Sequence, residues 1–373
     1  MNDDYGTGKK KRETMKRIFM VGYSGNKGGV ETYIDQLTEE LTEYEIIFSL
    51  PEMTVRGKTW HRPPNRHRYL EYRSFWNRFF RENRFDAIYY NTCDIISLDM
   101  LRFAKRAGIP VRIIHSHNTG TQQFIRDKQS LLHRLSEKIN RRTVERYATH
   151  LLACSENAGK WMFGSRPFTV IPNGIHPERF RYREDAGKVL REQYGMDGHP
   201  LVGIIGRLSA QKNPAYALRI LEALFRMEPS ARAFFAGDGT LRGETMEAAE
   251  KAGIRDRIVF AGAVDNIPEW MSAADVLLMP SLFEGLPFAL IEAQASGLPC
   301  VVSAAVTRDA DLTGLIRFMD LDSPPEAWAG ELIASAKQER KDHTEQVASA
   351  GYSIRDTAEK IRMIIENGGT IRN

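Results

Sequence analysis

Short apolar runs of strand length alternate with helix-forming segments along almost the whole chain, and this alternation constrains the fold more than any other feature. Parallel strands need a crossover connection, usually a helix, so the alternation predicts parallel sheets covered by helices. At 373 residues the chain exceeds what one hydrophobic core usually supports, so we expect two α/β domains. The predicted strands are 18–22, 45–50, 86–91, 111–117, 150–155 and 168–172 in the first series, and 201–206, 231–237, 258–261, 276–280, 299–303 and 316–319 in the second.

The boundary between the expected domains falls where turn-forming residues are dense. Residues 172–177 read Pro-Asn-Gly-Ile-His-Pro, and a charged stretch, 178–199, follows them. Proline and glycine favour turns, so we expect a linker here. We predict a first domain over 15–178 and a second domain from 179 onward. Residues 1–14 are polar and match no periodic template, so we expect them to form a disordered tail.

Basic residues are concentrated in the first half of the chain. Residues 15–178 carry 25 Lys or Arg against 17 Asp or Glu, whereas residues 179–373 carry 23 against 28. The run 56–84 alone holds nine basic residues, two glutamates and seven aromatic residues. Most of these aromatic residues share one helical face, which either packs in the core or, with its arginines, meets an anionic membrane surface. We find no nucleic-acid-binding module, so nucleic acid is not an expected partner.

The chain lacks the signals of a membrane-spanning or secreted protein. No apolar run approaches the roughly 18 residues of a transmembrane helix, and the N-terminal residues lack the apolar centre of a signal peptide. We therefore expect a soluble cytoplasmic protein. Its three cysteines are odd in number and widely spaced, which favours neither a disulfide framework nor a zinc site.

The sharpest chemical signal is a pair of glutamates around a Gly-Leu-Pro turn. Glu284 follows the predicted strand 276–280, and Glu292 lies in the helix expected after the turn. Ligands of open α/β sheets bind beyond the carboxyl ends of the strands, where this motif falls. Two carboxylates there suit the vicinal hydroxyls of a nucleotide sugar, one glutamate for each sugar ring. For Glu292, favourable interaction with the helix dipole is an alternative that needs no ligand.

Two cations follow the first strand of the second series. Arg207 and Lys212 lie five residues apart beside the end of strand 201–206. A rigid guanidinium and a mobile ammonium suit a diphosphate, and such charge-assisted hydrogen bonds are worth roughly 1.5–3 kcal/mol each. The alternative is a pair of solvated surface cations.

Glycines at strand ends suggest further contacts to phosphate. Gly237 and Gly239 follow the strand 231–237, where glycine lets the backbone approach a ligand and offer N–H groups. Neither they nor the first glycine-rich loop, 23–29, fit the dinucleotide pattern G-x-G-x-x-G. A nicotinamide or flavin enzyme is therefore disfavoured.

Two histidines, His115 and His117, end a strand of the first series and share one face of it. The adjacent Asn118 and Thr119 make this strand end polar. The alternative for each histidine is a hydrogen-bonded structural role.

Taken together, these motifs resemble the family-four retaining glycosyltransferases, close to the members that build bacterial capsular polysaccharides and exopolysaccharides. The resemblance runs from about residue 15 to the end of the chain and rests on the order and spacing of six motifs. They are Gly28-Gly29-Val30-Glu31, His115-Ser-His117-Asn118, Ile171-Pro-Asn-Gly174, Gly206-Arg207 with Lys212, Gly237-Asp-Gly239, and Glu284 with Glu292.

The resemblance implies a GT-B fold, in which two Rossmann-like domains face each other across a cleft. The last helix would cross back, so that 353–373 complete the acceptor domain and 179–352 form the donor domain. Residues 352–366 suit such a helix, since apolar residues recur at three- and four-residue spacing. Two features depart from the widest family pattern: Leu286 replaces a small residue, and 303–318 lack the usual acidic-glycine ending.

The implied activity is hexosyl or N-acetylhexosaminyl transfer from a nucleotide sugar, UDP-linked, to a saccharide or polyprenyl-linked saccharide, with retention of configuration. The implied catalytic residues are Arg207 and Lys212 on the diphosphate, Glu284 on the transferred sugar, and His117. The implied donor-binding residues are Gly29, Gly237, Gly239, Gly285, Leu286, Phe288 and Glu292. Family members generally need no divalent metal, so we expect neither a metal nor another cofactor.

Two other functions remain open on this sequence. A sugar-nucleotide epimerase can use the same two-domain fold, but it needs further acid–base residues that the sequence does not reveal. A non-catalytic partner subunit would keep the fold without the chemistry, and the presence of Arg207, Lys212, Glu284 and Glu292 argues against it.

Overall fold

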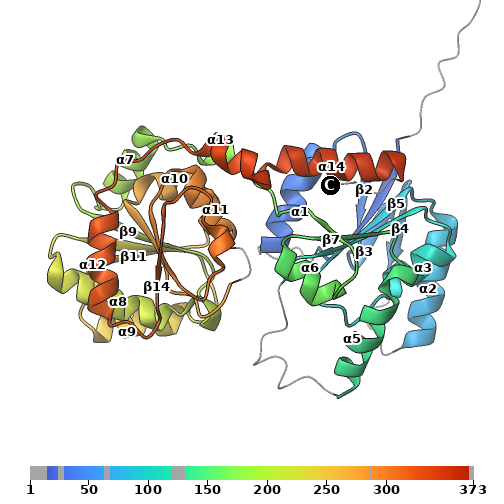
Figure 1. Cartoon of the computed structure of the whole chain (residues 1–373), viewed down its shortest axis with the longest axis horizontal. Coiled ribbons are helices and arrows are strands. Elements are labelled where there is room, and N and C mark those ends of the chain that lie inside the picture. Colours follow the sequence, from blue (N-terminus) through green and yellow to red (C-terminus); the bar gives the residue numbers. More distant parts are fainter. Residues whose placement is uncertain (1–14, 24–28, 63–67, 119–130, 285–286, 369–373) are drawn as a thin grey trace, which may run out of the picture. The chain divides into compact units, whose positions relative to one another are not determined.

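The computed structural model describes residues 15–23, 29–62, 68–118, 131–284 and 287–368. The chain divides into two compact units (Figure 1). The N-terminal unit comprises Met1–Val170 together with Ala358–Asn373, and the C-terminal unit comprises Ile171–Thr357. The division lies at Val170, earlier in the chain than the boundary at 178 expected from the sequence, because Ile175 already pairs with Ser353 of the C-terminal unit. The predicted tail, 1–14, lies outside the described residues.

The N-terminal unit is built on a parallel sheet whose described strands run in the order β2-β1-β5-β6-β7-β8. All five residues of β1 are buried, which is typical of a parallel strand covered by helices on both faces. Each strand lies on a run predicted from the sequence. The strands are β1 (Arg17–Val21), β2 (Glu45–Phe48), β5 (Ala87–Thr92), β6 (Val111–Ser116), β7 (His150–Ala153) and β8 (Thr169–Val170).

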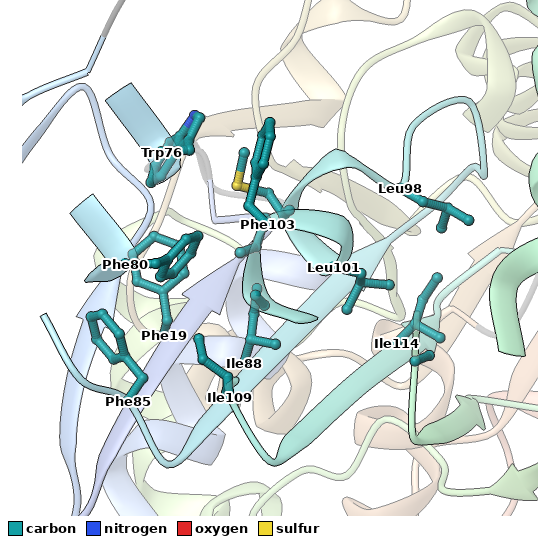
Figure 2. Packing of buried hydrophobic residues seen from close by; sticks show 14 of the residues in the cluster. Phe19, Trp76, Phe80, Phe85, Ile88, Leu98, Leu101, Phe103, Ile109 and Ile114 are labelled. Atoms are coloured by element: carbon teal, nitrogen blue, oxygen red, sulfur yellow. The ribbon is translucent and has the colours of Figure 1, made fainter. Parts of the chain in front are cut away.

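The basic aromatic run 56–84 contributes its large rings to the hydrophobic core. Trp76, Phe79 and Phe80 of α2 (Tyr69–Glu82) are buried, and Figure 2 shows Phe80 beside Phe19 of β1. The ring centroids of Phe19 and Phe80 lie 5.1 Å apart in an edge-to-face arrangement, which is favourable for aromatic pairs. Of the two interpretations left open for these rings, core packing therefore holds, while the arginines between them remain on the surface.

A two-stranded antiparallel hairpin, β3 (Glu52–Val55) and β4 (Lys58–His61), is an element that the sequence did not predict. Its residues alternate between exposed and buried, and Trp60 packs its ring against Phe79, with centroids 5.2 Å apart. Because only alternate residues face the core, the hairpin lacks the continuous apolar run that marks the strands of the large sheets.

Further helices of the described N-terminal unit flank this sheet, except α5, which extends away from it (Figure 1). They are α1 (Gly29–Glu40), α3 (Asp99–Arg106), α5 (Leu131–Thr143), α6 (Glu156–Phe163) and the later part of α14 (Ile354–Asn367). In the part of the chain that the structure describes, every helix is too short or too polar to cross a membrane.

The C-terminal unit has a second parallel sheet, with its described strands in the order β11-β10-β9-β12-β13-β14. The chain moves outward on one side of β9 and then returns to β12 on its other side. A crevice forms at such a reversal, beyond the carboxyl ends of the two central strands. The strands are β9 (Leu201–Ile205), β10 (Arg232–Ala236), β11 (Ile258–Gly262), β12 (Val276–Met279), β13 (Cys300–Ser303) and β14 (Ile316–Met319).

Helices cover both faces of this second sheet, and two large buried clusters form its core. One includes Trp270 and Phe234, and the other includes Trp328. The helices are α7 (Glu184–Gln193), α8 (Pro214–Met227), α9 (Arg242–Lys251), α10 (Ile267–Ala273), α11 (Phe288–Ala295), α12 (Pro325–Ser335) and α13 (Thr344–Val347).

The predicted last helix is present as α14, and most of it belongs to the N-terminal unit. Ile361, Ile364 and Ile365 are buried there. The Tyr44 hydroxyl donates to the Glu366 carboxylate at 2.8 Å, and Arg362 pairs with Glu43. The helix is therefore an integral part of the N-terminal unit, as the resemblance to the family implied.

Candidate functional site

The candidate site of the C-terminal unit lies on the loops that follow β9 and β12. These strands are neighbours in the sheet and parallel, so their carboxyl ends meet at the same edge. The loop after β9 carries Arg207 and the short helix η3 (Ala210–Lys212), and the loop after β12 carries Glu284. Two segments about 70 residues apart in sequence are thereby brought together.

Lys212 and Glu284, predicted from separate motifs, contact each other directly. The Lys212 ammonium lies 2.7 Å from Oε1 of Glu284, and the two side chains are only 21% and 7% exposed. This Oε1 is buried, and among the described residues no donor is aligned with it for a hydrogen bond. The pair is thus an ion pair whose carboxylate retains acceptor capacity.

Gln211, which was not among the site residues predicted from the sequence, also holds Glu284. Its side-chain nitrogen donates to Oε2 of Glu284 at 3.1 Å and lies 3.2 Å from the backbone oxygen of Phe283. Its own backbone oxygen accepts from the N–H of Leu282 at 2.8 Å. The signal available in the sequence was its position next to Lys212, on a loop already assigned to the site.

Asn213 completes this connection between the two loops. It adopts the left-handed conformation, with φ of 53°, and its side chain donates to the backbone oxygen of Pro280 at 3.2 Å. Asparagine tolerates this conformation better than most residues. Three consecutive residues, 211–213, therefore fix the course of the loop after β12.

Glu292, in the second turn of α11, has a different environment from Glu284. It is 8% exposed, and in the described parts of the chain no hydrogen bond or ion pair reaches its carboxyl group. Burial without a partner disfavours the ionised form and raises the pKa of Glu292 to about 7. The carboxyl group therefore keeps its capacity to accept hydrogen bonds from a ligand.

Arg207 lies at the surface and shares a small pocket with Lys212. Gly206, Pro280 and Ser281 also line this pocket. The Ser281 hydroxyl is buried and has no hydrogen-bond partner within the described structure. Two cations and a polar hydroxyl at a sheet edge suit an anionic group.

Gly237 and Gly239 have a structural explanation. A Cβ added at Gly237 would lie 2.0 Å from the backbone oxygen of Gly206, and one at Gly239 would lie 2.2 Å from that of Leu208. Their N–H groups donate to Gly262 and Asp238, each at 2.7 Å. The glycines thus allow the loops after β9 and β10 to pack backbone against backbone, and their role in donor binding stays a prediction.

In the N-terminal unit, His117 follows β6 and is oriented by Asn91 of β5. The His117 Nε2 lies 2.9 Å from the Asn91 side-chain oxygen, while the Asn91 nitrogen points to the backbone oxygen of Val21. Since the amide presents oxygen to the ring, Nε2 carries the proton. His115 is fully buried, with its Nδ1 2.7 Å from the Tyr89 hydroxyl, as expected for a structural residue.

The other predicted donor contacts stand at helix starts or outside the described residues. Gly29 is the first residue of α1, and Phe288 is the first residue of α11. The N–H groups of a first helical turn have no partner within the helix, which suits an anion. Gly285 and Leu286 lie outside the described residues. The roles of Gly29 and His117 also stay predictions.

Metal-ligating side chains do not gather in the described ranges. No group of three or more His, Cys, Asp or Glu side chains there could hold a metal ion. Cys93, Cys154 and Cys300 are all free thiols.

Comparison with known proteins gives two family matches that together span both units. The family described as Glycosyltransferase Family 4 matches residues 27–179, and the one described as Glycosyl transferases group 1 matches residues 199–336. The chain is 30% identical to EpsF of Bacillus subtilis, a provisionally assigned glycosyltransferase, over 91% of this chain and 93% of that protein.

A further relative has a more specific name. The UDP-Gal:alpha-D-GlcNAc-diphosphoundecaprenol alpha-1,3-galactosyltransferase of Escherichia coli is 26% identical over 61% of this chain and 59% of that enzyme.

Solved structures with the same fold include HepE of Anabaena in complex with UDP, with a TM-score of 0.66 and 18% identity over 93% of this chain and 95% of that one. They also include WaaG, a glycosyltransferase involved in lipopolysaccharide biosynthesis, with a TM-score of 0.66 and 18% identity over 94% of this chain and 100% of that one. At this level of identity, the likeness shows the fold.

Proposed function

Because the chain belongs to the family-4 glycosyltransferases and has their GT-B fold, we propose that it transfers a hexosyl or N-acetylhexosaminyl unit from a UDP-sugar to a saccharide or lipid-linked saccharide. The transfer retains the anomeric configuration and serves cell-surface polysaccharide synthesis. The chain acts in the cytoplasm, at the inner face of the membrane.

The observation that carries this proposal is the contact of Lys212 with Glu284, beside Arg207, where β9 and β12 end. Opposite charges at one edge of a sheet can hold the two chemical parts of a sugar diphosphate. Lys212 and Arg207 bind the diphosphate, and Glu284 accepts hydrogen bonds from hydroxyls of the transferred sugar. Each charge-assisted hydrogen bond contributes roughly 1.5–3 kcal/mol.

The nucleoside part of the donor is assigned to Glu292. Its buried, unpartnered carboxyl group suits the vicinal hydroxyls of ribose. UDP as the nucleotide is supported by HepE, which has been solved with UDP and with UDP-glucose, and by the name of the E. coli relative. The same name supports a diphosphate-linked lipid as the carrier of the acceptor.

Catalysis in this proposal depends on stabilising the leaving diphosphate. Negative charge grows on it as the glycosidic bond breaks, and preorganised cations stabilise that charge more in the transition state than in the ground state. The acceptor hydroxyl then attacks the anomeric carbon from the face of the leaving group and gives its proton to the departing diphosphate, so that the configuration is retained. The two cations supply positive charge at this position, and no divalent metal takes part.

The function is tested by incubating the full-length protein with UDP-glucose, UDP-galactose or UDP-N-acetylglucosamine and a polyprenyl-diphosphate-linked acceptor. We expect an elongated glycolipid with an α-linkage from one of these donors, formed equally well in EDTA. Conversion of the donor without acceptor would instead identify an epimerase. Failure to bind any nucleotide sugar in calorimetry would identify a non-catalytic subunit.

Association with an anionic membrane is supported by α5. The helix projects from the N-terminal unit (Figure 1), and Asn140 is its buried residue, donating to the backbone oxygens of Ile95 and Ile96. Its large aliphatic side chains point outward: Leu131, Leu132, Leu135 and Ile139 are 82%, 73%, 52% and 47% exposed.

The charges of α5 complement anionic lipid. Arg134, Lys138 and Arg142 are exposed on the same helix, against one acidic residue, Glu137. An aliphatic stripe beside basic residues is the composition of helices that lie in the membrane interface. We propose α5, rather than the run 56–84, as the main lipid contact.

We expect the double variant Leu132→Gln/Leu135→Gln to bind phosphatidylglycerol vesicles at least about 10-fold more weakly, because each leucine contributes up to roughly 1.5–3 kcal/mol when fully buried. Vesicle sedimentation at low salt provides the measurement. The matched control is Leu70→Gln, since Leu70 is 79% exposed on α2 within the run 56–84. Equal binding by the double variant, or loss of binding in the control, would contradict the assignment to α5.

A further inference from the structure

Among the described residues, Gln211 makes three hydrogen bonds, all to consecutive residues of the loop after β12. The backbone oxygen accepts from Leu282, and the side-chain nitrogen reaches the backbone oxygen of Phe283 and Oε2 of Glu284. These contacts hold both the main chain that carries Glu284 and its carboxylate.

The chemistry of the neighbours determines which way the Gln211 amide faces. A backbone oxygen can only accept, and a carboxylate oxygen is also an acceptor, so the amide nitrogen must face both. An NH2 group has two N–H bonds, one for Phe283 and one for Glu284. Gln211 therefore uses its full donor capacity on this loop.

The Glu284 carboxylate is consequently held from two sides. Gln211 donates to Oε2, the Lys212 ammonium lies 2.7 Å from Oε1, and the side chain is 7% exposed. Since both partners belong to η3, movement of that short helix would move the carboxylate with it. Groups held in this way interact with a substrate without reorganising during the reaction.

We propose that Gln211 is a positioning residue, which orients the Glu284 carboxylate toward the hydroxyls of the transferred sugar. The inference rests on the proposed function, because it takes Glu284 as the sugar-binding residue. Gln211 contributes to recognition of the sugar and not of the nucleotide, since its side-chain contacts are with Phe283 and Glu284.

The side chain at this position must be a neutral donor. A glutamate at position 211 would place a carboxylate oxygen where the amide nitrogen now lies, next to the Phe283 oxygen and the Glu284 carboxylate. Since all three groups are acceptors, their repulsion would displace the new side chain or the Glu284 carboxylate. A methionine has nearly the same length but offers no donor. We expect Gln211→Glu to impair transfer more than Gln211→Met.

The experiment compares wild type, Gln211→Met, Glu284→Ala and their double variant. Calorimetry gives Kd values for UDP and for the UDP-sugar that wild type uses, and steady-state kinetics give kcat and KM. We expect Gln211→Met to keep the UDP affinity within about 2-fold and to lower kcat/KM for the sugar donor by about 10- to 100-fold. In the Glu284→Ala background, the same substitution should change UDP-sugar affinity by less than about 2-fold.

Gln346→Met is the matched control. Gln346 also donates from its side chain to a backbone oxygen, that of Leu312 at 2.9 Å, in the same unit. It should behave as wild type in every measurement.

Three outcomes would overturn the proposal. Gln211→Met could have the same kcat/KM and Kd values as wild type. It could weaken UDP binding as much as UDP-sugar binding. It could also lower UDP-sugar affinity in the Glu284→Ala background as much as it does in wild type. A wild-type protein that neither binds nor uses a UDP-sugar would remove the proposed function as well, and that result separates the two failures.

Discussion

Lys212→Met is expected to lower kcat by about 100-fold, the size of effect found when one preorganised donor is removed from a transition state. The ammonium lies 2.7 Å from Glu284, so its loss removes both the cation for the leaving diphosphate and the partner of a carboxylate that is 7% exposed. Initial rates with saturating donor and acceptor provide the measurement.

Lys251→Met is the control for this substitution, because Lys251 is an exposed lysine at the end of α9, outside the site. A second comparison tests the ion pair itself. Chemical unfolding without donor should show Lys212→Met to be less stable by about 1–3 kcal/mol, since it leaves a buried charge unpaired. Adding Glu284→Gln should restore part of this loss. A Lys212→Met enzyme with full activity would refute the site assignment.

Glu292→Gln is expected to stabilise the ligand-free protein at pH 8 and to have little effect near pH 4. Burial raises the pKa of Glu292 from 4.5 to about 7, so the folded state favours the protonated acid. The stability that Glu292 contributes is fully present below about pH 4.5 and is lost as pH rises through about 7. The difference amounts to about 3 kcal/mol.

Glutamine has nearly the same shape and does not titrate, so it escapes this loss at pH 8. Thermal unfolding at pH 4 and pH 8 gives the comparison, with Glu247→Gln as the control on an exposed residue of α9. If the difference in thermal stability between Glu292→Gln and wild type were the same at pH 4 and pH 8, the role of burial at Glu292 would be contradicted.

The same substitution should weaken nucleotide binding. If the ionised carboxylate accepts hydrogen bonds from ribose, UDP affinity of the wild type rises with pH through about 7, whereas that of Glu292→Gln stays flat and about 10-fold weaker at pH 8. Calorimetry with UDP across this range measures both trends. Parallel pH profiles for the two proteins would argue against ribose binding by Glu292.

The fold was largely predictable because parallel strands are buried on both faces. Such strands read as continuous apolar runs, as in β1, and each of the twelve predicted runs corresponds to a strand of one of the two sheets. The hairpin β3–β4 was missed because it lacks such a continuous apolar run. Its residues alternate between exposed and buried, and among the surrounding charged residues this alternation is too short to indicate a strand.

The charged residues of the candidate site could be predicted from the sequence, because charged side chains are conspicuous next to apolar strands. Lys212 and Glu284 were assigned from the strands they follow, and the order of the sheet brings them together. Gln211 was missed because a neutral amide leaves no signature until its partners are known. The raised pKa of Glu292 depends on burial by residues distant in sequence.

The last helix makes the N-terminal unit discontinuous in sequence. Its fold needs Ile361, Ile364 and Ile365, yet the whole C-terminal unit is synthesised between Val170 and Ala358. The N-terminal unit therefore cannot finish packing while its own first 170 residues leave the ribosome. It must wait, with the surface that α14 covers still exposed, until Ala358 and the residues that follow it in α14 have been synthesised, whereas the C-terminal unit is a single continuous segment and can fold first.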